Sequence, residues 1–218
     1  MAKRADFMVI GLGRFGSAAA EGLVALGQEV IGVDASDARV QHHMNLIGQA
    51  VQANGADIDA MRQVGAGDVG TALIAVGSDI EASILAASVI LEIGVPRVWA
   101  KAVTSRHGAI LERIGVHRVI YPERDMGNRV AHALVGRALD FVMLDPRFAM
   151  AETMVPPSVS GKGLAEAGIR SRHDVTVVCV KKPGGDYTPA TAETVIENGD
   201  ELLVVGEAAK VEAFTRLD

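Results

Sequence analysis

The stretch VIGLGRFGSAAAEGL, residues 9–23, places glycines at positions 11, 13 and 16 between an apolar run and a helical pattern. A G-x-G-x-x-G spacing directly after a strand and at the start of a helix is typical of a dinucleotide-binding turn. The first glycine permits the tight turn, the second lets the backbone approach a phosphate, and the third lets helix and strand pack together. The free N–H groups at the start of the helix favour an anion there.

An alternation of strands and helices extends from this turn to residue 121. Apolar and β-branched runs predict strands over 7–11, 30–33, 50–52, 71–76, 97–101 and 118–121. Helical patterns lie between them, near 15–26, 37–46, 57–64, 79–92 and 106–113. This order predicts an α/β fold with a doubly wound, parallel, six-stranded Rossmann-type sheet. Residues 1–122 are therefore expected to form the first, nucleotide-binding domain.

A second, smaller domain is expected after the parallel sheet. Residues 123–145 are interpreted as a crossover helix and linker, with the helix over 123–141. The apolar residues near one face of this helix are Met126, Val130, Ala133, Leu134 and Phe141. Residues 146–218 are interpreted as a small α+β domain, with strands over 175–180 and 202–205, turns over 184–186 and 198–200, and a closing helix over 207–217.

Composition narrows the functional classes. The 218 residues carry a net charge of −6, which gives no basic footprint and argues against nucleic acid as a partner. The single cysteine, Cys179, excludes an internal disulfide framework and indicates a reducing compartment. Residues 82–93, the longest mostly apolar segment, are too few to span a bilayer, and the N-terminal apolar run has no separate cleavage site. We expect a cytoplasmic protein.

Two polar residues near the glycines bear on the choice of nucleotide. Asp34 ends the second predicted strand, where its carboxylate can accept hydrogen bonds from ribose hydroxyls and would repel a 2′-phosphate. The alternative is a capping aspartate. Arg14 can pair with phosphate oxygens, or reach the ligand of a neighbouring subunit, and this favours a nucleotide with a highly charged terminal phosphate. The alternative is a solvated arginine at a helix start.

The sequence offers no candidate for catalysis. A hydride-transfer enzyme needs a substrate domain and an acid–base group beside the nicotinamide. The six histidines, at positions 42, 43, 107, 117, 132 and 173, fall mostly in helical or strand-edge positions without a clear partner. We therefore predict that the chain is not an enzyme and has no catalytic residues.

A series of segments also occurs in the same order as in a known family. The segments are VIGLGRFG, EVIGVDAS, AVQANGADI, LIAVGSDIEASILA, VWAKA, LERIGVHRVIYPERDMG and ENGDELLVVG. They resemble the KtrA/TrkA regulators of potassium conductance, which consist of an RCK N-terminal and an RCK C-terminal domain. IGLGRFG with YPERDMG is similar to the KtrA subtype in particular, and the resemblance covers nearly the whole chain.

The resemblance implies a gating subunit at the inner face of the cell membrane. In that family the N-terminal domains dimerise and assemble into an octameric ring beneath a membrane-embedded potassium transporter of the KtrB/TrkH type. ATP and ADP bind at the glycine loop and hold the ring in different shapes. A ligand shifts such a gate only by as much as it prefers one ring state. An Arg14 that reaches a terminal phosphate across the dimer would distinguish ATP from ADP.

Carried over by position, the resemblance implies a nucleotide site built from several loops. The phosphate loop is Gly11, Gly13, Arg14, Phe15 and Gly16, the ribose side is Asp34, Ala35 and Ser36, the adenine side is Asn54, Gly55 and Ala56, and Ala75, Val76 and Gly77 pack near the base and ribose. The family usually has threonine at position 56, so Ala56 lacks one hydroxyl contact.

The resemblance also implies that Lys101 faces the phosphates, whereas its position alone would suit a solvated lysine at a strand end. Glu123 matches a family glutamate near the dimer interface, where Mg²⁺ or Ca²⁺ can bridge carboxylate and phosphate oxygens. From spacing alone, Glu123 is a first-turn residue that stabilises the helix dipole. Both interpretations stay open.

In the second domain, GIRSRHDVTVV resembles the segment that binds cyclic di-AMP in KtrA-type regulators. Arg170 would lie against a phosphate in a symmetric pocket between two subunits, with apolar contacts from Ile169 and Pro189. The alternative is a charged loop before a strand.

Three functions are therefore open. The first is the ATP- and ADP-binding regulator of a potassium transporter. The second is an NAD(H)-binding sensor of the TrkA type, for which Asp34 is equally suitable and Arg14 less so. The third is a small NAD-dependent oxidoreductase, for which the acid–base group is missing.

Overall fold

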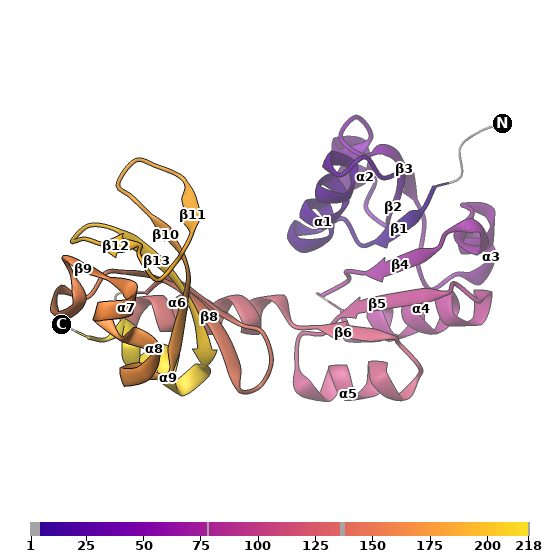
Figure 1. Cartoon of the computed structure of the whole chain (residues 1–218). Helices are drawn as coiled ribbons and strands as arrows, with labels where there is room; N and C mark the ends of the chain where they lie inside the picture. Colours follow the sequence, from indigo (N-terminus) through magenta and orange to yellow (C-terminus); the bar gives the residue numbers. More distant parts are fainter. Residues whose placement is uncertain (1–4, 78, 136–137, 218) are drawn as a thin grey trace. The chain divides into compact units, whose positions relative to one another are not determined.

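The computed structural model describes residues 5–77, 79–135 and 138–217 of the chain. The chain divides into two compact units, Met1–Glu123 and Arg124–Asp218 (Figure 1). Among the described residues, none of the helices combines the length and the apolar composition that a bilayer span requires.

The first unit is a parallel sheet of six strands in the order β3-β2-β1-β4-β5-β6. Its strands are β1 (Phe7–Ile10), β2 (Val30–Asp34), β3 (Gly48–Gln52), β4 (Thr71–Ile74), β5 (Arg97–Lys101) and β6 (Arg118–Ile120). Its helices are α1 (Arg14–Ala25), α2 (Asp37–His43), α3 (Ile58–Gln63), α4 (Ile80–Ile93) and α5 (Ser105–Arg113), with a 3-10 turn, η1, at Ala66–Asp68. The six-stranded, doubly wound sheet predicted from the sequence is confirmed.

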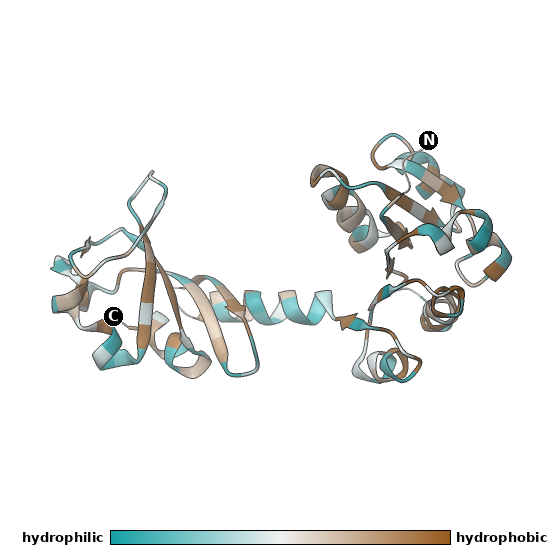
Figure 2. Cartoon of the chain, turned by 45° about the vertical axis from the view of Figure 1, so that its right-hand side comes forward, coloured by the Kyte–Doolittle hydropathy of each residue, from teal (hydrophilic) through white to brown (hydrophobic). Residues whose placement is uncertain are grey.

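Separate apolar clusters cover the two faces of this sheet. One contains Val9, Leu12 and Ala20, and so joins β1 to α1. The other contains Ile74, Ile90 and Leu111, and so joins β4 to α4 and α5. Figure 2 shows the hydrophobic residues concentrated on the strands between these layers. The strand order reverses between β1 and β4, and in open α/β sheets such a reversal leaves a crevice at the carboxyl ends of the strands.

The second unit contains an antiparallel sheet in the order β11-β10-β13-β8-β7 and a two-stranded ribbon, β12-β9. The strands are β7 (Ala138–Met143), β8 (Phe148–Met154), β9 (Lys162–Gly163), β10 (Val175–Lys181), β11 (Tyr187–Pro189), β12 (Val195–Ile196) and β13 (Glu201–Glu207). The helices are α6 (Pro122–Val135), which begins in the last residues of the first unit, α7 (Leu164–Ala167), α8 (Ile169–His173) and α9 (Ala208–Thr215), with a 3-10 turn, η2, at Pro157–Val159. The predicted strands near 175–180 and 202–205 and the closing helix correspond to β10, β13 and α9.

The prediction of one helix over 123–141 is wrong beyond Val135. Residues 138–143 form β7, and residues 136–137 lie outside the described part. Phe141, which the helical spacing placed beside Met126 and Val130, is a buried strand residue in the core of the second unit. Pairing of β7 with β8 satisfies the backbone groups of this segment and overrides its helical spacing. Met126, Val130 and Leu134 remain on α6 and are exposed in the single chain.

Candidate functional site

The glycine loop between β1 and α1 is a tight contact of backbone against backbone. Gly11 has φ +97°, in the left-handed region that favours glycine, and its Cα faces the backbone of Ala75 and Val76 after β4. A Cβ on Gly16 would lie 1.8 Å from the carbonyl oxygen of Gly11. A Cβ on Gly13 would meet nothing within 4 Å. Gly11 and Gly16 are thus required by the fold, whereas Gly13 leaves open space over its backbone.

Asp34 fastens the end of β2 to this loop. Its Oδ2 accepts a hydrogen bond from the backbone N–H of Leu12 at 2.7 Å, and its Oδ1 accepts one from Ser36 at 2.8 Å. Only 7% of the residue is exposed, so its carboxylate lies among buried groups rather than in solvent. A third donor, Nη1 of Arg39 on α2, reaches Oδ2 at 3.3 Å. The predicted ribose acceptor is therefore also a structural link between two loops.

Lys101 and Glu123 form an ion pair where β5 and β6 end. Lys101 Nζ lies 2.5 Å from Glu123 Oε1, and the lysine is buried while the glutamate is exposed. The same Nζ lies 5.8 Å from the ring centroid of Phe15 on α1. A Cβ on Gly77 would come within 3.1 Å of it. Residues predicted separately from four segments are thus brought together around one ammonium group.

The charges of this cluster are coupled. The hydrogen bond from Lys101 is the main cause that lowers the pKa of Glu123, and the positive charges of Lys101 and Arg14 lower it further. Glu123 is therefore ionised at neutral pH, with both cations within electrostatic range. An incoming phosphate would meet two positive side chains, one of which already has a carboxylate partner.

The loop after β3 lies at the same edge of the sheet. Asn54 Oδ1 accepts the backbone N–H of Ala56 at 3.0 Å, which shapes a short turn. A Cβ on Gly55 would lie 2.7 Å from Cγ2 of Ile10, so this glycine permits close packing on β1. The carbonyl oxygen of Ala35 accepts a hydrogen bond from Gln52 Nε2 at 3.2 Å. The predicted adenine side is thus attached to β1 and to the segment after β2.

The described residues of one chain do not supply a complete divalent cation site. Within residues 5–77, 79–135 and 138–217, no three or more His, Cys, Asp or Glu side chains gather in a way that could hold a metal ion. Glu123 contributes a single carboxylate, and Lys101 competes for it. Mg²⁺ and Ca²⁺ prefer six or more oxygen ligands, so most of them would have to come from outside this chain.

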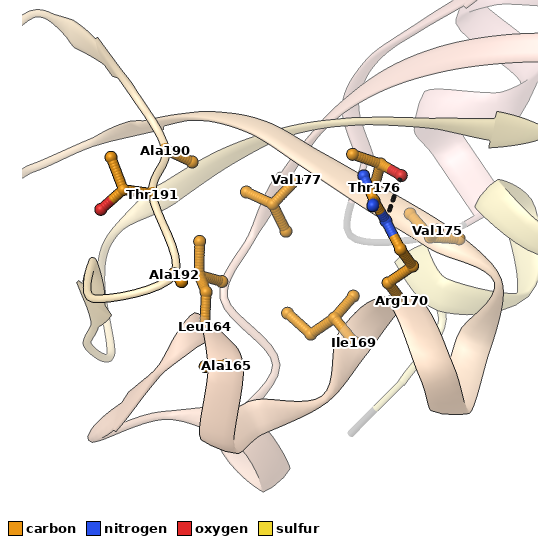
Figure 3. A pocket seen from close by; sticks show the side chains of 10 residues that line it. All are labelled: Leu164, Ala165, Ile169, Arg170, Val175, Thr176, Val177, Ala190, Thr191 and Ala192. Carbon is orange, nitrogen blue, oxygen red and sulfur yellow. Dashed lines mark hydrogen bonds between the residues drawn. The ribbon is translucent and has the colours of Figure 1, made fainter.

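The second unit contains a cavity of about 320 Å³ (Figure 3). Its lining residues are Leu164, Ala165, Ile169, Arg170, Val175, Thr176, Val177, Ala190, Thr191 and Ala192. Arg170 Nε donates a hydrogen bond to Thr176 Oγ1 at 3.2 Å, which holds the guanidinium at the side of β10. Two of the residues predicted here, Ile169 and Arg170, line this cavity. Pro189 does not, although it directly precedes three lining residues.

Sequence reasoning missed Arg39 and most of the residues that line the cavity in the second unit. Arg39 lies five residues after Asp34, beyond Ser36, the last residue predicted on the ribose side. Ala190–Ala192 carry no charge or motif, and only their position after β11 places them on the cavity. Arg39 could have been found by continuing one turn into α2, whereas Ala190, Thr191 and Ala192 gave no signal.

Comparison with known proteins matches both units. The TrkA-N domain family matches residues 7–122, and the TrkA-C domain family matches residues 150–217. The Ktr system potassium uptake protein A of Vibrio alginolyticus is 35% identical over 207 residues, 94% of each chain. The protein of the same name from Bacillus subtilis is 29% identical over 213 residues, 97% of this chain and 96% of the relative.

A solved structure has a similar fold at low identity. The GsuK channel bound to NAD superposes with a TM-score of 0.68 at 17% identity. The match covers 98% of this chain and 39% of the GsuK chain, so this chain spans well under half of the channel's length.

Proposed function

The chain belongs to the family of proteins with TrkA-N and TrkA-C domains, and from this membership we propose that it is the nucleotide-binding regulatory subunit of a potassium uptake system. The observation that carries the proposal is similarity to Ktr potassium uptake proteins over nearly the whole of both chains. The glycine loop supports it, because Gly11 and Gly16 have the close contacts that a phosphate-binding turn requires.

The proposed ligand is an adenine nucleotide at the carboxyl edge of the parallel sheet. Its phosphates lie over Gly13, its ribose reaches Asp34, and its base lies toward Asn54 and Ala56. Arg14 and Lys101 favour ATP or ADP, because a terminal phosphate carries more charge than the pyrophosphate of a dinucleotide. A terminal phosphate competes with Glu123 for Lys101. Nucleotide binding therefore alters the ion pair that Lys101 forms with Glu123, the second residue of α6.

NAD(H) is the second candidate ligand of the same site. The GsuK channel, which shares this fold, has been solved with NAD. Asp34 suits the ribose of either ligand. An oxidoreductase reaction is not part of the proposal, because relatives similar over the whole chain are potassium uptake proteins.

The proposed partner is a membrane-embedded potassium transporter subunit, which holds the chain at the inner face of the membrane. Two copies pair, and the pairs assemble into an octameric ring. Regulation then follows from differential affinity, since ATP and ADP can bias the ring only if each prefers one state. Mg²⁺ or Ca²⁺ belongs to the proposal only in a nucleotide-bound dimer, where phosphate oxygens and a second Glu123 add ligands.

The cavity in the second unit supports a second ligand, cyclic di-AMP. Arg170 offers charge-assisted hydrogen bonds to a phosphate, and Ile169 with its aliphatic neighbours offers an apolar wall. In this proposal the cavity of one chain is half of a symmetric site.

Calorimetric titration of the full chain with ATP, ADP, NADH and cyclic di-AMP tests these proposals. ATP should bind without turnover, and an Arg14→Ala variant should lose the preference for ATP while ADP still binds. An equal ATP preference in the variant would remove the role of Arg14. Binding of NADH alone would favour the dinucleotide sensor, and no binding of any adenine nucleotide would refute the proposed ligand class.

A further inference from the structure

In the free chain, the carboxylate of Asp34 already accepts hydrogen bonds from three donors, which is more than a carboxylate left open for a ribose would accept. Oδ2 accepts the backbone N–H of Leu12 at 2.7 Å and Nη1 of Arg39 at 3.3 Å, and Oδ1 accepts the backbone N–H of Ser36 at 2.8 Å. An ionised carboxylate has about four acceptor positions on its two oxygens. Three donors therefore leave about one position for a ligand.

A ribose presents two neighbouring hydroxyl groups, and both need an acceptor to be held in a bidentate manner. One of the three donors must therefore leave when such a sugar binds. Leu12 and Ser36 donate from backbone fixed by the glycine loop and by the end of β2. Arg39 donates from a side chain that is 54% exposed, over the longest of the three contacts. Its departure costs the least, because a displaced guanidinium regains water.

We propose that Arg39 is a specificity-determining residue of the nucleotide site: it occupies in the free chain the acceptor position that a ribose hydroxyl takes on binding. This inference rests on the proposed function, because it requires an adenine nucleotide at Asp34. The hydroxyl then contributes only the difference between its own hydrogen bond and that of the guanidinium. The wild-type chain therefore discriminates weakly between ribonucleotides and 2′-deoxyribonucleotides.

A two-by-two comparison tests the proposal. The dissociation constants of ADP and 2′-deoxy-ADP are measured by calorimetry for the full wild-type chain and for Arg39→Met. Methionine keeps much of the side chain's length and removes the donors. In the variant, the preference for ADP should increase by about two- to fivefold, the range of an ion pair whose cation is exposed to solvent. The quantity compared is the dissociation constant of 2′-deoxy-ADP divided by that of ADP. This ratio cancels the general effect of losing one positive charge.

Arg62→Met is the matched control. Arg62 is also in the first unit and is 57% exposed, compared with 54% for Arg39, and it faces Asp59 at 3.8 Å, so its loss removes the same charge from a similarly exposed side chain. This variant should leave the ratio at the wild-type value. Circular dichroism confirms that both variants are folded, as expected for exposed side chains.

The outcomes separate this inference from the proposed function. A ratio that stays the same or falls in Arg39→Met, while ADP still binds, means that the guanidinium remains in place or supports the sugar, and the inference is overturned. A ratio that rises equally in Arg62→Met also overturns it, because the effect is then one of net charge. No ADP binding to the wild-type chain refutes the proposed ligand and this inference together.

Discussion

A pair of alanine substitutions in the glycine loop separates folding from binding. In Gly16→Ala the new methyl group would lie 1.8 Å from the Gly11 carbonyl oxygen and 2.9 Å from the Ala75 Cβ. To reach even 3.0 Å from that oxygen, helix and loop must separate by about 1.2 Å. That movement strains the 2.7 Å bond from Gly11 N–H to Val33 and the 2.8 Å bond from Ser17 N–H to Gly13.

The expected cost follows from these two effects. Overpacking of a rigid site costs about 1–3 kcal/mol, and each weakened backbone hydrogen bond adds about 0.5–1.5 kcal/mol. With two such bonds weakened, we expect Gly16→Ala to lower the free energy of unfolding by about 2–6 kcal/mol. Trp99 is the single tryptophan of the chain and lies on β5, so urea unfolding followed by its fluorescence reports on the first unit.

Gly13→Ala is the matched control. Gly13 has φ −74° and ψ −176°, which alanine adopts without strain, and a Cβ there meets nothing within 4 Å. Its unfolding free energy should stay within about 1 kcal/mol of wild type. Its affinity for ADP should fall at least about tenfold, because the methyl group stands where the phosphate approaches the backbone. A Gly16→Ala protein as stable as wild type, or a Gly13→Ala protein as unstable as Gly16→Ala, would contradict the separate roles of these two glycines.

Three further predictions follow from the side chains. Burial lowers the pKa of His107 below its ordinary 6.5, so protonation favours unfolding and the wild-type chain loses stability as the pH falls below about 6.5. This loss should be smaller in His107→Gln, as measured by the midpoints of urea unfolding at a series of pH values. Lys101→Met should raise the pKa of Glu123 toward its ordinary value, measured by carboxyl carbon NMR; an unchanged pKa would contradict the ion pair. Phe141→Ala should lower the free energy of unfolding of the second unit by about 3–5 kcal/mol, because Phe141 is buried. Leu139→Ala on the same strand, where the side chain is 51% exposed, should change this free energy by less than about 0.5 kcal/mol. Circular dichroism during unfolding measures both.

The first unit was predictable because its signals are local. Each buried strand, such as the fully buried VIGVD of β2, is a short apolar run next to a helical pattern. The glycine spacing then fixes the turn between β1 and α1. These features depend on a few neighbouring residues, so the order of the elements could be read along the chain.

The second unit was less predictable because its strands depend on distant partners. Residues 138–143 have an apolar spacing compatible with a helix, and only their pairing with residues 149–153 makes them a strand. After the exposed Phe148, β8 alternates buried and half-buried residues as far as Met154, a strand pattern that the interruption by nearby prolines obscured.

The candidate site divides in the same way. Gly11, Gly16 and Asp34 follow a motif whose spacing is set by one strand and one turn. The ion pair of Lys101 with Glu123 joins residues 22 positions apart, and nothing in the spacing of the sequence predicts that they meet. Arg39 was missed although it lies only five residues after Asp34, because the predicted ribose side ended at Ser36, before α2 begins.

The two hydrogen bonds that Asp34 accepts from backbone N–H groups affect how mutations at this position are interpreted. Replacing it by asparagine turns one acceptor into an amide donor that faces an N–H group, of Leu12 or of Ser36. Such a protein would lose the shape of its turn as well as the proposed contact with a ribose. Loss of nucleotide binding in a variant at position 34 is therefore ambiguous. Nucleotides whose sugar lacks one hydroxyl at a time are the cleaner probe.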